Sequence, residues 1–221
     1  MATVKTPQPP AAPRYAQLTP LASLGSDGIG DDDVVLELEV ADVFLDAHSV
    51  EFAELGECHL RSGSMANSNW YKSLWRDLRL DTIDLANASF DQASWRRLSL
   101  QGCRLTGLEL SDSTLEDLDF HHGVLDEANF RMASLRRVRF DGTRMAGVDL
   151  SNARAVDVAF IDCDLTGAHF DHFRAERVRF ENCRLDGVQG VTGLRGSTIS
   201  TLDLMELTTQ LAAALGITLE A

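Results

Sequence analysis

The sequence has 221 residues, of which 34 are acidic, 20 are basic and 44% are hydrophobic, and its formal net charge is −14. A chain of this length and composition is expected to bury a sizeable core in one domain, which excludes disorder along its whole length. No apolar run approaches the ~18 residues of a membrane-spanning helix, and the acidic balance argues against binding nucleic acid through a basic surface.

The N-terminal part of the chain differs in composition from the rest. All five prolines lie within the first thirty residues, and every acidic residue among positions 1–75 lies between Asp27 and Glu57. No period is visible here, so residues 1–33 are expected to form a disordered or loosely ordered, acidic and proline-rich segment. This region also lacks the continuous apolar core of a secretory signal, which favours a cytoplasmic protein.

The central part of the chain repeats every five residues. Every fifth residue from Leu45 to Leu185 is apolar, a run of 29 positions whose chance probability is on the order of 10⁻¹⁰ at a fixed phase. A second set of residues, mostly small or β-branched, stands two positions before each of these. Neither a helix nor an ordinary strand keeps such positions on one side. The chain must therefore turn regularly and point two residues of every five inward.

A second period shows how many turns close a circuit. Phenylalanines recur every twenty residues, and we expect them to stack as a core ladder: Phe120, Phe140, Phe160 and Phe180. Twenty residues therefore make one coil with four sides of five, and neighbouring coils are expected at strand spacing, about 4.8 Å.

The repeated units resemble a known family. Stretches such as Ala128-Asn129-Phe130 and Val148-Asp149-Leu150 are similar to the A(D/N)LXX motif of pentapeptide-repeat proteins. The resemblance covers about residues 41–190 and implies an all-β fold, a right-handed four-sided parallel β-helix. Because His48 occupies an inner position, regular coils are expected only over residues 51–190, with residues 34–50 as an N-terminal cap.

The C-terminal segment, residues 191–221, changes period. Its apolar residues follow helical spacing: Leu204, Leu207, Leu211 and Leu215. Ser200 or Thr201 can cap such a helix, and Gly216 can end it. One interpretation is an end cap, because an open stack of coils exposes core and unpaired backbone. The other is a homodimer contact, which the resemblance implies because some family members associate through this end.

The sequence gives no sign of catalysis. It contains no GxxxxGK[ST], GxGxxG, HExxH, GxSxG or CxxC motif. Its histidine pairs lack a third ligand, and a convex β-helix offers no cleft in which carboxylates would be desolvated. We therefore expect a non-enzymatic protein with no metal site and no cofactor, whose cysteines are reduced core residues.

One side of the expected β-helix is acidic. It comprises residues 86–90 and the equivalent stretches of the later coils, and it has no Lys or Arg. Its acidic residues are the candidate partner-binding residues: Glu109, Asp126, Glu127, Asp149 and Asp186. Four glycines, at positions 107, 147, 167 and 187, suggest that this side is flat.

Two functions fit this surface. Some members of the family resemble B-form DNA and bind type II topoisomerases, so the resemblance implies a protein partner such as DNA gyrase or topoisomerase IV, without direct nucleic-acid or membrane binding. The alternative is a scaffold or regulatory interaction module without DNA mimicry. Five acidic residues are few for a DNA mimic, and the sequence leaves both functions open.

Overall fold

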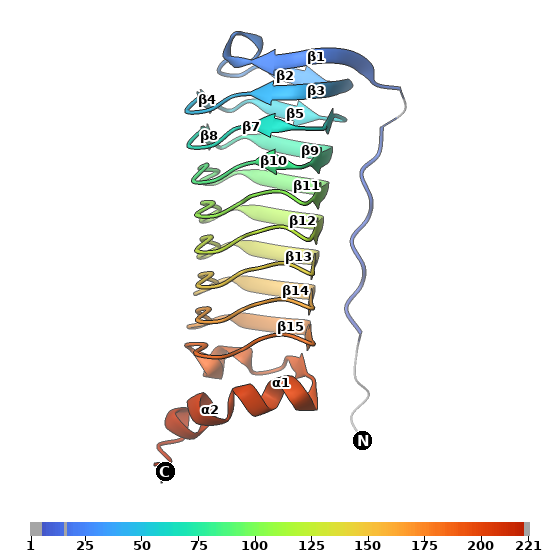
Figure 1. Cartoon of the computed structure of the whole chain (residues 1–221). Coiled ribbons are helices and arrows are strands. Elements are labelled where there is room, and N and C mark those ends of the chain that lie inside the picture. The colour runs from blue at the N-terminus through green and yellow to red at the C-terminus, as the bar shows by residue number, and fades with distance from the viewer. Residues whose placement is uncertain (1–5, 16, 219–221) are drawn as a thin grey trace.

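The computed structural model describes residues 6–15 and 17–218 and is a parallel β-solenoid of about nine turns (Figure 1). The expected four-sided β-helix is thereby confirmed. The main sheet follows the order β10-β7-β3-β6-β9-β11-β12-β13-β14-β15-β16, so most coils pair with the coil before and the coil after. A second, two-stranded sheet joins β4 and β8.

Strands β11 to β15 are each eight residues long, whereas the strands before them vary from two to eight residues. Their bounds are β1 (Thr19–Gly25), β2 (Val34–Leu36), β3 (Leu38–Phe44), β4 (Ser49–Glu51), β5 (Glu54–Gly56), β6 (His59–Leu60), β7 (Gly63–Ser64), β8 (Asn69–Tyr71), β9 (Leu74–Asp81), β10 (Ile83–Asp84), β11 (Ser94–Gln101), β12 (Thr114–His121), β13 (Ser134–Asp141), β14 (Arg154–Ile161), β15 (Arg174–Glu181) and β16 (Thr198–Ile199). Short 3₁₀ turns lie at Ser26–Gly28 and Val191–Leu194, and the helices are α1 (Thr201–Glu206) and α2 (Thr208–Ala214).

The corners of the coils recur every five residues. From residue 67 to residue 187, every fifth residue has a φ between 51° and 69°, which is the left-handed conformation. This single residue turns the chain, and the residues after it point alternately inward and outward. Asp77, for example, divides β9 into two parts that lie on adjacent sides, with Trp75 buried on one and Leu78 on the other.

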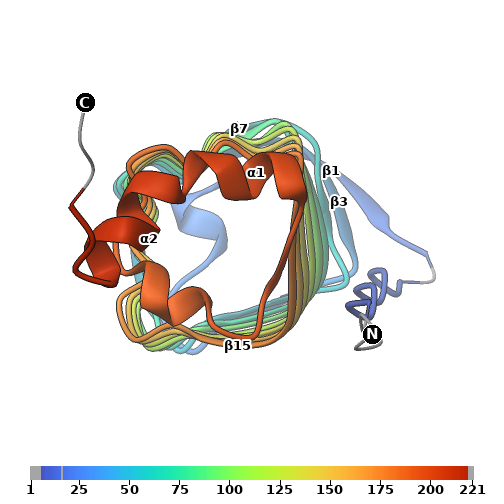
Figure 2. The ribbon, with the colours of Figure 1, turned by 90° about the horizontal axis from the view of Figure 1, so that it is seen from below.

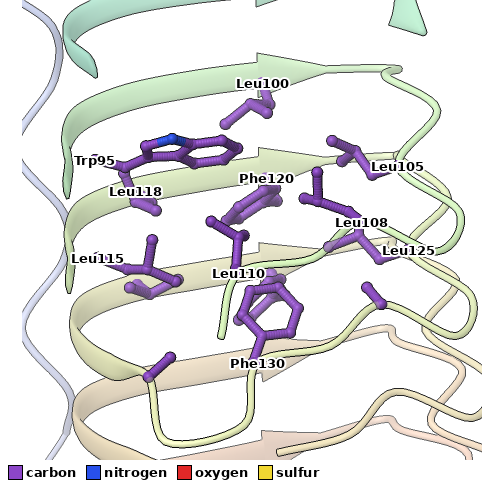
Figure 3. Close-up of a cluster of buried hydrophobic side chains, with 14 of the residues drawn as sticks. Trp95, Leu100, Leu105, Leu108, Leu110, Leu115, Leu118, Phe120, Leu125 and Phe130 are labelled. Carbon is purple, nitrogen blue, oxygen red and sulfur yellow. The ribbon is translucent and has the colours of Figure 1, made fainter. Parts of the chain in front are cut away.

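The twenty-residue register stacks equivalent residues of successive coils on one another. The expected phenylalanine ladder is present, since Phe120, Phe140, Phe160 and Phe180 pair in adjacent strands and each is at most 1% exposed. Neighbouring rings stack with centroid distances of 4.8, 5.1 and 4.8 Å. Figure 3 shows part of this core, with leucine, tryptophan and phenylalanine side chains from successive coils filling the interior.

The N-terminal boundary differs from the expected one. Residues 34–44 do not form a separate cap, because Val34 pairs with Glu54 and Val40 with Leu60 in the same twenty-residue register as the later coils. Strand β1 in turn pairs with β3 and adds the first partial coil. The inward His48 does not interrupt the coil, because its Nε2 lies 2.8 Å from the carbonyl oxygen of Ile29.

The segment before β1 also differs from the expected loose tail. Residues 6–15 run in extended form along one corner of the stack (Figure 1). Their direction is opposite to that in which successive coils follow one another along the chain. Residues 1–5, which belong to the same expected segment, lie outside the described residues.

The C-terminal segment covers the last coil. Figure 2 shows α1 and α2 lying across the end of the stack. The expected single helix is divided at Leu207, which ends α1, precedes α2 and is 1% exposed. Ser200 caps α1 by accepting a hydrogen bond from the Asp203 N–H at 3.1 Å. Neither helix of the described portion is long and apolar enough to cross a membrane.

Candidate protein-binding surface

The predicted acidic residues lie on one side of the solenoid and on the corner beside it. Glu109 and Asp149 stand mid-side, in a row that continues through Asn129 between them. Glu127 occupies a corner position with a φ of 57°. Asp126 immediately precedes that corner, and Asp186 precedes the equivalent corner three coils later. The structure therefore brings the five residues together as a stripe along the stack.

Glycine has a structural role along this stripe. The four glycines that the sequence suggested would flatten the side occupy its corner, with φ values of 66° to 69°. A residue with no Cβ adopts this conformation without strain. These four glycines carry no side chain, so the corner is smooth on their coils and carries the Glu127 side chain between Gly107 and Gly147.

Two arginines form ion pairs with acidic residues of the stripe. Nε of Arg144 lies 2.7 Å from Oδ2 of Asp126, and Nη1 of Arg131 lies 3.4 Å from Oδ2 of Asp149. The absence of Lys and Arg from this side of the sequence therefore overstated its negative charge. The remaining three acids, Glu109, Glu127 and Asp186, are exposed, and none has an ion-pair partner among the described residues.

Hydrogen bonds hold two of the carboxylates in place. Asn129 donates to Glu109 through its Nδ2 at 2.7 Å. Burial would raise the pKa of Asp149, but hydrogen bonds from Ser151, together with the charge and hydrogen bond of Arg131, outweigh it and lower the pKa below its ordinary value. The hydrogen bonds orient both carboxylates, and the lowered pKa keeps that of Asp149 ionised at neutral pH.

A second set of charged residues lies at a different corner and forms a ladder of ion pairs along the stack. The ladder positions hold Asp and Arg on alternate coils, and each arginine pairs with the aspartate of the coil before it. The Nε–Oδ1 distance is 2.6 Å in each of the three pairs: Arg97–Asp77, Arg137–Asp117 and Arg177–Asp157. The aspartates are only 3–4% exposed and the arginine side chains 16–27%, so the pairs are largely buried.

The burial of these aspartates comes partly from the N-terminal segment, which sequence reasoning missed. The backbone N–H groups of Gln8, Ala11 and Arg14 donate to Oδ1 of the three aspartates at 3.2, 3.0 and 2.9 Å: Asp157, Asp117 and Asp77 respectively. The signal that would have revealed this contact is the spacing of the prolines. None of them stands at position 8, 11 or 14, where an N–H is needed.

The cysteines and histidines form no site in the described part of the chain. All four cysteines are free and buried. Burial raises the pKa of the Cys103 thiol to about 12, which keeps it protonated and unreactive. No group of three or more His, Cys, Asp or Glu side chains among the described residues is placed to hold a metal ion.

The predicted C-terminal leucines are divided between core and solvent. Leu207 is buried and Leu211 packs against the core, whereas Leu204 and Leu215 are 44% and 74% exposed. Further apolar side chains surround these two at the end of the stack: Leu202, Met205 and Ile217, which are 76%, 68% and 54% exposed. The segment therefore caps the last coil with one face and presents an apolar face to solvent.

Comparisons with known proteins agree with the repeat. Residues 80–117 match the family profile described as pentapeptide repeats (8 copies), and residues 119–189 match the profile described as pentapeptide repeat region. No curated protein sequence matches the chain.

Several solved structures are similar to this chain. Full-length QnrB1, a plasmid-mediated fluoroquinolone resistance protein, is 12% identical over 90% of this chain and 98% of its own, with a TM-score of 0.33. HetL, a pentapeptide repeat protein involved in heterocyst differentiation regulation in the cyanobacterium Nostoc sp. strain PCC 7120, is 17% identical over 76% and 87%, with a TM-score of 0.30. A pentapeptide repeat protein of the Arabidopsis thaliana thylakoid lumen is 17% identical over 53% and 69%, with a TM-score of 0.30.

Proposed function

The chain belongs to the pentapeptide-repeat family, and for this member we propose a non-enzymatic role in which its acidic side binds the DNA-binding saddle of a type II topoisomerase. The observation that carries the proposal is the stripe of acidic residues described above. It contains no basic residue of its own and follows the stack at intervals fixed by the coils.

The chemistry of the stripe suits a surface built for phosphates. A basic saddle that binds the regularly spaced charges of a DNA backbone attracts a rigid row of carboxylates for the same electrostatic reason. Hydrogen bonds within the solenoid hold Glu109 and Asp149, so little side-chain entropy is lost when the row meets its partner. The contacts are exposed, and salt should therefore weaken them.

The test is a titration of purified protein into a gyrase supercoiling assay, with binding measured in parallel. The informative variant carries Glu109→Lys, Glu127→Lys and Asp186→Lys, since these three acids have no arginine partner to leave behind. We expect the wild-type protein to inhibit supercoiling at low salt and the variant to lose both inhibition and binding.

A control variant separates the stripe from overall charge. Asp27→Lys, Glu37→Lys and Asp162→Lys change the net charge by the same amount at exposed positions outside the stripe. This control should bind and inhibit as the wild type does. If both variants lost binding and inhibition equally, the effect would come from general charge attraction, which would contradict the proposed docking side.

A second candidate function, a scaffold or regulatory interaction module without DNA mimicry, is favoured by the arginines in the stripe. Arg144 and Arg131 neutralise two of the five carboxylates, so that shape contributes more to recognition and charge less. A wild-type protein that neither binds gyrase nor alters its activity at low salt would support this function in place of topoisomerase binding.

A further inference from the structure

We propose that the corner carrying the buried Asp–Arg pairs is a binding groove for polyproline II peptides, and that the chain's own residues 6–15 occupy it as a gating ligand. This inference does not depend on the proposed topoisomerase binding, because it concerns a different part of the solenoid and a different ligand class.

The hydrogen bonds between residues 6–15 and the corner are regularly spaced on both partners. The donors Gln8, Ala11 and Arg14 are three residues apart, and their acceptors lie forty residues, or two coils, apart on the solenoid. A polyproline II helix has three residues per turn and rises about 3.1 Å per residue, or about 9.3 Å per turn. Two coils span about 9.6 Å at strand spacing. One turn of the peptide therefore matches two coils of the solenoid.

The alternation of Asp and Arg along the corner explains why one turn of the peptide corresponds to two coils. Asp recurs only on every second coil, with Arg on the coils between, so the acceptors have the period of a polyproline II turn. An aspartate on every coil would offer acceptors about 4.8 Å apart, which corresponds to no whole number of polyproline II residues. Each arginine also neutralises its aspartate, so the groove accepts neutral backbone N–H groups without requiring a cationic ligand.

The burial of the segment shows the same period of three. Pro7, Pro10 and Pro13 are half-buried, whereas Pro9 and Ala12 on the outer face are exposed. Viewed along the stack in Figure 2, the segment winds around an axis parallel to the solenoid. One row of prolines thus faces the protein, and the adjacent row of residues supplies the N–H donors.

The floor of the groove is apolar where the prolines are concentrated. Residues 6–10 lie over a hollow lined by Val138, Ala159 and Ile161, with Arg139, Arg179 and Glu181 at its margin. Ala159 and Ile161 face outward on strand β14, where the equivalent residues of β15, Arg179 and Glu181, are charged. An apolar outer surface next to polar anchoring groups is the arrangement that proline-rich ligands recognise.

The ligand class follows from these contacts. The groove fits a proline-rich peptide in polyproline II conformation that retains an N–H at every third position and places proline at the residue before each donor. In the intact chain residues 6–15 are tethered beside the groove by a short connection to β1, so their effective concentration is on the order of millimolar. A peptide in trans binds only after this segment has been displaced.

The test uses the full-length protein with Gln8→Pro, Ala11→Pro and Arg14→Pro. These substitutions remove the three donors while raising the polyproline II preference of the segment, so any release reflects lost hydrogen bonds. A fluorescently labelled synthetic peptide with the sequence of residues 6–15, TPQPPAAPRY, is the probe, and fluorescence anisotropy is the measurement. We expect saturable binding to this variant and at least about tenfold weaker binding to the wild-type chain.

Two controls identify the recognised groups. Ala12→Pro in the full-length protein adds a proline at an exposed position that donates no hydrogen bond to the groove, and it should exclude the probe as the wild type does. A probe carrying proline at the three donor positions should not bind the protein with Gln8→Pro, Ala11→Pro and Arg14→Pro. This triple variant is called the released variant, because its residues 6–15 are expected to leave the groove. Hydrogen exchange of the Ala11 amide should be slow in the wild type and in the Ala12→Pro protein.

Each result of the probe-binding experiment either supports or overturns the proposal. Binding of the probe to the released variant, with exclusion by the other two proteins, supports the groove and its gating segment. Failure of the probe to bind a released variant whose thermal unfolding remains cooperative overturns the proposal. Equal binding to the wild type and the released variant overturns the gating role, and equal binding of the proline-substituted probe overturns the recognition of N–H donors.

Discussion

The carboxylate of Glu206 in α1 accepts a hydrogen bond from the backbone N–H of Leu185 at a distance of 2.5 Å. One coil earlier, the equivalent N–H of Leu165 donates to the carbonyl of Arg184 in the following coil, at 2.9 Å. Leu185 lies in the last coil and has no following coil, so a helix carboxylate takes the place of the missing carbonyl. The C-terminal segment therefore ends the ladder with a hydrogen bond as well as with apolar packing.

This contact predicts that Glu206→Ala loosens the last coil. The substitution leaves a half-buried N–H without its charged acceptor, which should lower the free energy of unfolding by about 1–3 kcal/mol. Chemical denaturation measures the loss, and hydrogen exchange should show faster exchange at the Leu185 amide. Glu127→Ala, at an exposed corner, is the matched control and should change stability by less than about 0.5 kcal/mol. Equal losses in the two variants would contradict a capping role for Glu206.

The stacked phenylalanines predict a larger effect inside the coil. Phe140 lies between the rings of Phe120 and Phe160 and is fully buried, so Phe140→Ala should cost about 3–5 kcal/mol through the cavity that it leaves. Phe140→Leu keeps most of the volume and should cost less. Phe140→Asp should prevent folding, because the core offers its charge no partner. Urea denaturation followed by circular dichroism measures the first two variants, and solubility with far-UV circular dichroism tests the third.

The interior of this protein was predictable because its period is strict. An apolar residue at every fifth position fixes which side chains point inward, and the twenty-residue columns fix which of them stack. The expected ladder from Phe120 to Phe180 follows from these two periods alone. By contrast, the position of His48 suggested a later start for the coils than the structure shows. A single carbonyl, that of Ile29, satisfies this histidine, and a period search cannot anticipate such a contact.

The charged surface was predictable only in part, for a different physical reason. Sequence columns place Glu109 and Asp149 correctly along one side. They do not show that the long side chains of Arg131 and Arg144 reach Asp149 and Asp126 and neutralise two of the five carboxylates. The docking of residues 6–15 depends on a match between a peptide period and a charge period in distant parts of the chain. Composition alone suggests disorder for such a segment.

The buried Asp–Arg pairs predict a dependence of stability on acid. Burial would raise the pKa of Asp117, but hydrogen bonds from Arg137 and from the Ala11 N–H, with the charge of Arg137, outweigh it and lower the pKa. The pKa of Asp157 is lowered chiefly by its hydrogen bond from Arg177. A carboxyl whose folded-state pKa lies below its unfolded value stabilises the protein fully above the unfolded pKa, near 3.8. That stabilisation is lost as the pH falls from about 5 through the folded-state pKa.

Asp117→Asn should therefore destabilise the protein at neutral pH and flatten its acid unfolding curve. Arg137 would lose its principal partner, and since Glu116 still contacts it, the loss should be about 3 kcal/mol, the lower end of the range for breaking a buried pair. Thermal unfolding between pH 7 and pH 2 measures both effects. Asp112→Asn, an exposed carboxylate, serves as the control. A variant with unchanged stability at pH 7 would show that the pair contributes little to folding.

The exposed apolar face at the C-terminal end predicts a homodimer. Leu202 and Met205 are 76% and 68% exposed on α1, and Leu215 is 74% exposed just after α2. An apolar patch of this kind at the end of a stack is typical of a surface that a second copy covers. We expect light scattering to give the mass of a dimer at micromolar concentration for the wild type and the mass of a monomer for Leu202→Asp with Met205→Asp. Leu207, which is buried against the last coil, is left unchanged so that the cap stays intact.

The control variant is Met132→Asp, which replaces a half-exposed methionine on the flank of the solenoid, and this protein should remain a dimer. A wild-type protein that is monomeric at this concentration would contradict the dimer and leave the helices with the capping role that Glu206 and Leu207 already perform.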